Sequence, residues 1–281
     1  MIGWLRRRWT GARAPSRAIP EGLWQDVLAA YPFLARLDEP RRRRLRCLSA
    51  AFLDAKEFHG AQGLQVTDAM ALAVAAQACL PLVDLASDTR PERVLAWYDD
   101  FVGIVMQPAA VRAARTRQDE DGVVHEYEEE LSGEAMDGGP VMLSWDAVAE
   151  AGNSAGDGFN VVIHEFAHKI DLKDGEVDGC PPLPDGFMGH ARAARARAAW
   201  RDVFDAALRD FAARVEAADR FPGLVEAPWL DPYAAHSSGE FFAVVVEAYW
   251  VNPERLALEF PGLMPWLDAF FRPRPRDVLR P

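Results

Sequence analysis

Two spacings of hydrophobic residues alternate along the chain, and each predicts a different kind of element. From residue 20 to about residue 86, apolar side chains recur every three or four positions, which predicts helices. β-Branched and aromatic residues then fall into short runs, which predict strands at 93–98, 101–106, 123–131 and 141–145. Helical spacing returns in the rest of the chain, where helices are expected at 159–172, 190–218, 239–250 and 253–271.

This order of elements predicts an α+β fold that is mainly helical, with a small β-sheet beside the helix at 159–172. Residues 1–19 lack periodicity and are expected to form an N-terminal tail, and residues 273–281 a C-terminal tail. No linker-like stretch divides the residues in between. We therefore expect a single domain over residues 20–272, with a helical part at 20–90 and the part that carries the candidate chemistry at 91–272.

The charge balance narrows the range of partners. With 31 basic and 43 acidic residues, the formal net charge is −12, which argues against a nucleic-acid-binding surface. The run from Arg41 to Arg46 is interleaved with Leu45 and Leu48 at helical spacing, which favours a solvated helix face over a nucleic-acid site. The carboxylates within 123–131 admit a calcium site, but a half-exposed strand is the favoured interpretation.

The sequence predicts neither membrane insertion nor export. The most apolar stretch, 70–86, contains Gln77, Pro81 and Asp84, and therefore predicts a buried helix that ends near Pro81 and no membrane span. The N-terminus has the positive charge of a signal peptide but not its apolar core. The three cysteines are too few and too scattered for a disulfide framework or a thiolate zinc site. A cytoplasmic protein is expected.

The chemistry is indicated by five consecutive residues, His164-Glu165-Phe166-Ala167-His168. On a helix, residues four apart project from the same face, so His164 and His168 can bind one metal ion. Glu165 is rotated by about 100° from His164 and can reach a water molecule on that metal. Zinc is the expected ion, because it accepts nitrogen and oxygen ligands tetrahedrally and lowers the pKa of its water. The alternative is two histidines on an ordinary helix.

A catalytic zinc has three protein ligands, and Glu240 is the preferred third. It begins an apolar segment suited to a helix that packs against the first one. The alternative is a capping box, Ser237-Ser238-Gly239-Glu240, whose carboxylate folds back onto its own helix start. Glu247 lies seven residues later on the same face and is expected to orient a ligand histidine. His236 is also near in sequence, but a loop histidine in solvent is the favoured interpretation.

Asp171 follows His168 by three positions and so faces the site side of the helix. Its carboxylate can accept the outer N–H of a ligand imidazole. With equal weight, it can cap the helix end or pair with Lys169 or Lys173.

These residues resemble the Mlc titration factor A family of bacterial zinc metallopeptidases, over roughly residues 20–272. Four segments carry the resemblance: Gly158 to Asp171, Tyr233 to Val244, Gly139 to Trp145 and Gln77 to Pro81. The spacing from Tyr233 to Glu240 is also similar to that in the catalytic domain of anthrax lethal factor. One departure is the segment 180–200, which is longer and richer in Ala and Arg than expected of the family.

The resemblance implies a zincin-like metallopeptidase fold in which His164, His168 and Glu240 bind zinc, Glu165 is the base and Tyr233 points into the site. It also implies a cytoplasmic location and aminopeptidase-like cleavage of small substrates. In enterobacterial members it implies binding to the glucose repressor Mlc. Without the resemblance, an ordinary turn tyrosine is the favoured interpretation of Tyr233.

A zinc peptidase is therefore expected, in which Glu165 takes the proton of the attacking water and returns it to the leaving amine, while Tyr233 stabilises the oxyanion. The strand at 141–145 is expected to align the peptide by strand addition. Ser144 and Trp145 would then bind substrate, or equally be ordinary strand residues. A second hypothesis is a protein that sequesters a transcriptional repressor, with the metal site secondary. A purely structural zinc is the third.

Overall fold

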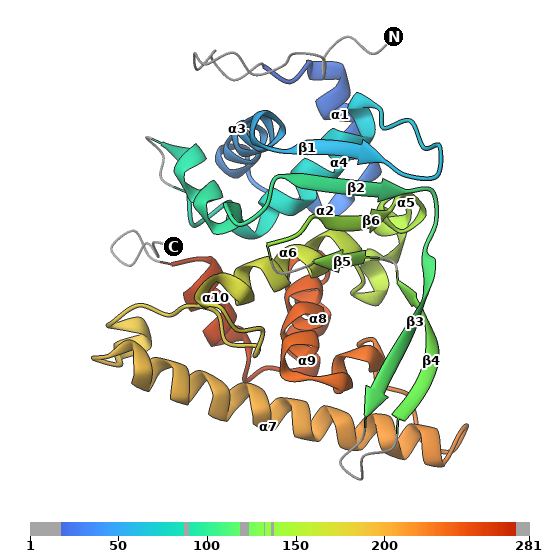
Figure 1. Cartoon of the computed structure of the whole chain (residues 1–281). Coiled ribbons are helices and arrows are strands. Elements are labelled where there is room, and N and C mark those ends of the chain that lie inside the picture. The colour runs from blue at the N-terminus through green and yellow to red at the C-terminus, as the bar shows by residue number, and fades with distance from the viewer. Residues whose placement is uncertain (1–17, 87–89, 119–123, 132, 136–137, 274–281) are drawn as a thin grey trace.

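Helices make up most of the chain, together with one small sheet and a separate hairpin (Figure 1). The computed structural model describes residues 18–86, 90–118, 124–131, 133–135 and 138–273. This mixture confirms the mainly helical α+β fold.

The first part of the chain is a group of helices that pack on one another: α1 (Glu21–Ala30), α2 (Pro32–Ala35), α3 (Glu39–Ala55) and α4 (Asp68–Cys79). α4 begins where the Thr67 hydroxyl accepts the N–H of Met70 at 3.3 Å. Every residue of α4 from Met70 to Cys79 is buried, so this part of the helix lies inside the core and has no solvent face. Two 3₁₀ helices follow it, η1 (Leu80–Leu82) and η2 (Pro91–Tyr98).

The sheet contains three parallel strands and one antiparallel strand. Its order is β1 (Glu57–Gly60), β2 (Gly103–Gln107), β6 (Val141–Ser144) and β5 (Gly133–Ala135). β5 pairs with β6 in the antiparallel sense, and the other pairs are parallel. Among the described strands, β5 is therefore one edge of this sheet. The remaining strands, β3 (Val111–Gln118) and β4 (Val124–Leu131), form an antiparallel hairpin that projects away from it (Figure 1).

The second group of helices is arranged around α6 (Val161–Asp171), which carries the histidine motif. α6 contacts β5 and β6 of the sheet, α4 of the first group, and α8 (Ser238–Val251). α8 is buried along nearly all of its length, and it therefore holds α6 firmly against the core. The other elements of this group are α5 (Trp145–Ser154), η3 (Ala155–Asp157), η4 (Leu172–Asp174), η5 (Phe187–Gly189), α7 (Ala193–Arg220), η6 (Pro232–His236), α9 (Pro253–Glu259) and α10 (Met264–Phe271).

The strand predicted at 93–98 is wrong, because these residues belong to the 3₁₀ helix η2. Their buried side chains, Val94, Trp97 and Tyr98, are three and four positions apart, so a helical period was hidden by a strand-like composition. The helical prediction for 20–86 also missed the short strand β1.

The strand predicted at 141–145 ends one residue earlier, at Ser144. The Ser144 hydroxyl accepts the N–H of Ala147 at 3.3 Å and so caps α5, a helix that the apolar pattern did not predict. β6 is hydrogen-bonded to β2 on one side and β5 on the other. A peptide therefore cannot add to this strand, and the strand addition expected there is wrong. The described edge strand next to α6 is β5.

The three lysines of the chain all bind the segment 96–101. Lys56 Nζ donates to the carbonyls of Tyr98 and Phe101 at 2.5 Å. Lys169, on α6, contacts the Asp100 carboxylate at 2.7 Å, and Lys173 donates to the carbonyl of Ala96 at 2.5 Å. These contacts join α6 to the segment that leads into β2.

The arginines of α3 are ion-paired within the protein. Arg41 and Arg44 both contact Asp84, and Arg46 contacts Glu21, as the helix-face interpretation favoured. The three cysteines are free. Within the described residues, no helix combines the length and the apolar character needed to cross a bilayer.

Candidate metal centre

The two histidines of the motif are presented by α6, whose start is set by Asn160. The Asn160 side chain accepts the N–H of Ile163 at 2.9 Å, which satisfies one of the free donors at the helix start. His168 follows His164 by four positions, about one helical turn, and their rings meet edge to face with centroids 4.7 Å apart. The two histidines therefore lie on the same face of α6, as their spacing in the sequence predicts.

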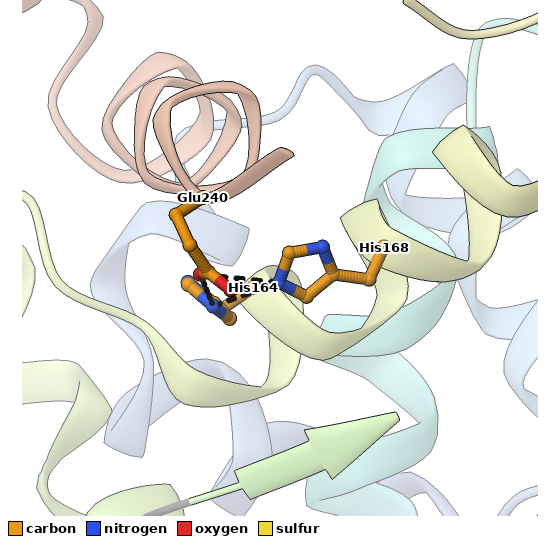
Figure 2. Close-up of side chains that lie close together, drawn as sticks. All are labelled: His164, His168 and Glu240. Carbon is orange, nitrogen blue, oxygen red and sulfur yellow. Dashed lines mark hydrogen bonds and ion pairs between the residues drawn. The ribbon is translucent and has the colours of Figure 1, made fainter. Parts of the chain in front are cut away.

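The carboxylate of Glu240 comes from α8 and meets both imidazoles (Figure 2). Its Oε2 lies 3.1 Å from Nε2 of His164 and 3.3 Å from Nε2 of His168. The two Nε2 atoms are themselves 3.1 Å apart. The exposed fractions of the three side chains are 12%, 13% and 21%, so each is largely buried but open to solvent on one side.

These three atoms fit a zinc ion. With bond lengths of about 2.0–2.1 Å, a tetrahedral zinc separates its ligand atoms by about 3.3 Å, close to the three distances observed. Two imidazoles and one carboxylate leave the fourth position free, as in catalytic zinc sites. Within the described residues, no other group of three His, Cys, Asp or Glu side chains is arranged to hold a metal.

Glu247, seven residues further along α8, holds the imidazole of His164 at the ring nitrogen that does not face Glu240. Its Oε1 lies 2.6 Å from Nδ1 of His164, so the imidazole donates from Nδ1 and keeps the Nε2 lone pair for a metal. Burial alone would lower the pKa of His164, but Glu247 and Glu240 outweigh it and raise that pKa well above its usual value. The same negative charge favours a bound cation at this point.

His168 has a different environment. Burial lowers its pKa, so the neutral form, which binds metals, is favoured. Its Nδ1 is buried without a hydrogen-bond partner. Asp171, three residues later, accepts the N–H of Gly179 with Oδ2 at 2.8 Å, while its Oδ1 is also buried without a partner. Asp171 therefore anchors the loop after α6. No hydrogen bond joins it to His168 in this structure, and its role in orienting that imidazole stays a prediction.

The capping-box alternative for Glu240 is half right. Ser237 does cap α8, with its hydroxyl accepting the N–H of Glu240 at 3.2 Å. The Glu240 side chain, however, reaches the histidines and does not fold back onto the helix start. Burial would raise the pKa of Glu240, but the two histidines outweigh it and hold that pKa well below its usual value. The carboxylate is thus ionised, as a metal ligand must be.

Glu165 is buried beside the edge strand β5, with 5% of its surface exposed. Gly133, on β5, lies directly against the Glu165 side chain. A Cβ atom on this glycine would lie only 2.7 Å from Cγ and 2.8 Å from Cδ of Glu165. Gly133 therefore leaves room for the carboxylate. Gly133 could not be recognised from the sequence, because a single glycine in a strand carries no signal of what it approaches.

Tyr233 lies on η6, just before α8, and its ring centroid is 6.3 Å from that of His164. The Asp231 carboxylate accepts its N–H at 2.9 Å and so starts the 3₁₀ turn. The exposed His236 also packs against Tyr233, with ring centroids 4.8 Å apart. It does not belong to the group of side chains that could hold a metal. The turn thus places the tyrosine beside the metal centre.

Comparisons with known proteins show the family to which the chain belongs. The family model described as "Glucose-regulated metallo-peptidase M90" matches residues 3–272. The chain belongs to this metallopeptidase family. It is 30% identical over 281 residues to "Mlc titration factor A" of Yersinia pestis (strain Pestoides F) and of Yersinia pseudotuberculosis serotype O:1b (strain IP 31758). In both cases the match covers 100% of this chain and 93% of the relative.

Membership of the M90 metallopeptidases implies a metal, and the three converging atoms are where the described residues can hold it. Ser144 and Trp145 lie at the start of α5. Ser144 is buried and caps that helix, and Trp145 is half-buried against the core. Ser144 thus has a capping role and Trp145 a packing role, and the part of both in substrate binding stays a prediction.

Proposed function

We propose that this chain is a zinc-dependent peptidase that cleaves peptide bonds at the centre formed by His164, His168 and Glu240. The observation that supports this most strongly is the convergence of the three ligand atoms at 3.1–3.3 Å. Those separations match the edges of a zinc tetrahedron, and the sequence places a buried glutamate, Glu165, directly after the first ligand.

When bound, zinc supplies a Lewis acid that polarises a carbonyl and lowers the pKa of a coordinated water to about 7. Glu165 acts as the general base: it accepts a proton from the attacking water and returns it to the leaving amine. Its burial beside Gly133 restricts the carboxylate to a small volume, which suits a group that must transfer a proton twice at the same place.

Tyr233 is proposed to donate its hydroxyl hydrogen bond to the oxyanion that forms on the substrate carbonyl. Its ring contact with His164 places it on the side of the metal centre next to η6. Substrate binding is proposed at β5, because this strand is the described edge of the sheet beside Glu165. A peptide that adds to β5 would bring its carbonyl toward the base.

We propose that the peptidase activity is aminopeptidase-like, that its substrates are small peptides and that it acts in the cytoplasm, in keeping with the family resemblance. A purely structural zinc is disfavoured, because the described residues supply three ligands and no fourth.

Zinc dependence tests the proposal. The full chain is stripped with a chelator, reloaded with one equivalent of zinc, and assayed on internally quenched peptides of mixed sequence. We expect turnover to disappear on stripping and to return with zinc. Glu240→Gln should weaken zinc binding by about 100-fold or more, whereas Glu254→Gln, at an exposed glutamate on α9, should not. A zinc-loaded wild type that cleaves no peptide contradicts the proposal.

The name of the relatives supports a second candidate, a binding protein for a transcriptional repressor of the Mlc type. In that case the metal site would be secondary. Pull-down of such a repressor by the zinc-stripped chain, at the affinity of the zinc-loaded chain, would favour this second function.

A further inference from the structure

A chain of buried hydrogen bonds runs from α4 to the imidazole of His164. Glu247, which holds Nδ1 of His164 with one oxygen, accepts the backbone N–H of Asn160 with the other at 2.5 Å. The Asn160 amide donates from Nδ2 to Oε1 of Gln77 at 2.8 Å. The Gln77 amide in turn donates from Nε2 to the carbonyl of Ala73 at 3.1 Å.

The two amides in this chain have only one arrangement that satisfies every partner. Asn160 must turn its oxygen toward the N–H of Ile163, because it caps α6, and its NH₂ group then faces Gln77. Gln77 must turn its NH₂ group toward the Ala73 carbonyl, and its oxygen then faces Asn160. Asn160 and Gln77 are both fully buried, so water cannot replace either partner.

We infer that Gln77 is a positioning residue for the metal ligand His164, acting through Asn160 and Glu247. The inference rests on the proposed function, because it assumes that His164 binds a metal. Glu247 is a buried carboxylate with 1% of its surface exposed, and both of its oxygens are bound. Its second oxygen is therefore tied to the Asn160 N–H, and the Asn160 side chain is held on both sides, by the N–H of Ile163 and by Gln77.

The alternative is that Gln77 only satisfies a buried amide and contributes to folding. The two roles differ in what a substitution changes. Loss of a folding contact lowers stability alone. Loss of a positioning contact also weakens zinc binding and loosens the imidazole of His164.

Gln77→Met tests this, since it keeps the length of the side chain and removes the hydrogen bonds to Asn160 and Ala73. Zinc affinity is measured in the full chain by competition with a chromogenic chelator. We expect the zinc dissociation constant to rise about tenfold. Leu72→Met, a volume-conserving change at a fully buried position of α4, is the control and should leave it unchanged. An unchanged constant in Gln77→Met, or an equal rise in the control, overturns the inference.

A second variant covers the case that Gln77→Met does not fold. Asn160→Ser keeps a good helix cap and the backbone N–H, but loses the donor to Gln77. In the zinc-stripped protein, NMR should show a slowly exchanging Nδ1 proton on His164 that exchanges faster in either variant. Neither measurement uses peptide turnover. A wild type that binds zinc but cleaves no peptide would therefore contradict the proposed function and leave this inference standing, whereas an unaltered Nδ1 proton in both variants would overturn it.

Discussion

The substitution Gly133→Ala tests how tightly the structure confines the candidate base. The added Cβ would lie 2.7 Å from Cγ and 2.8 Å from Cδ of Glu165, and closer still to Oε1. Carbon atoms in favourable contact are about 3.5–4.0 Å apart, so the side chain or the strand must move by roughly 1 Å. The conformation of Gly133 is one that alanine can adopt without strain, so the clash is the main effect.

A shift of this size at a catalytic group lowers the rate by about 100-fold, which corresponds to about 2.7 kcal/mol of activation free energy. We expect that fall in kcat/KM for a quenched peptide, with one zinc still bound per chain. Gly103→Ala is the matched control: it lies in the same sheet, and its Cβ would meet only Pro140 at an ordinary 3.5 Å. If Gly133→Ala keeps activity within about threefold of wild type, Glu165 is not confined as described.

Three other substitutions test separate parts of the account. Tyr233→Phe should lower kcat about 100-fold with little change in KM, because one donor to the oxyanion is lost; an equal rise in KM would point to ground-state binding instead. Gly179→Ala should lower the free energy of unfolding in urea more than Gly186→Ala. Both glycines have positive φ, but only the Cβ at position 179 would clash with the Ser238 carbonyl, 2.8 Å from its carbon. Equal losses would contradict that contact. Burial lowers the pKa of Lys56 from 10.5 to about 8. Between about pH 8 and 10.5, Lys56 is therefore more protonated in the unfolded chain than in the folded one, and the free energy of unfolding rises with pH over this range. Lys56→Met should remove up to about 2 kcal/mol of this rise in the free energy of unfolding between about pH 8 and 9.5. If urea unfolding shows the same pH dependence in the variant and the wild type, the lowered pKa of Lys56 is contradicted.

The metal centre was largely predictable, because its residues are linked by short, regular spacings. His164 and His168 share a helix face by geometry alone, and Glu240 and Glu247 do the same on α8. What the sequence left open for Glu240 was a choice between a ligand and a cap. In the structure the Ser237 hydroxyl accepts the backbone N–H of Glu240, while the Glu240 carboxylate meets the histidines. Only the serine half of the capping box forms, and the side chain of Glu240 lies where a metal ligand would.

The parts that were not predictable depend on contacts between distant segments. Gly133 approaches Glu165 only because β5 pairs with β6 and lies against α6. Gln77 reaches Asn160 across 83 positions of the chain. Neither contact leaves a periodic signal in the sequence. The sheet edge was misplaced for the same reason, since strand order follows from pairing and not from the apolar pattern of one strand.

Zinc content and peptide turnover, measured together on wild type and on Glu165→Gln, test the central claim most directly. The amide that this substitution introduces cannot accept the proton of the attacking water, but His164, His168 and Glu240 remain to bind the metal. We predict one zinc per chain in both proteins and a loss of turnover of about 10²–10⁴-fold in the variant. Equal turnover in the two zinc-loaded proteins would contradict the account.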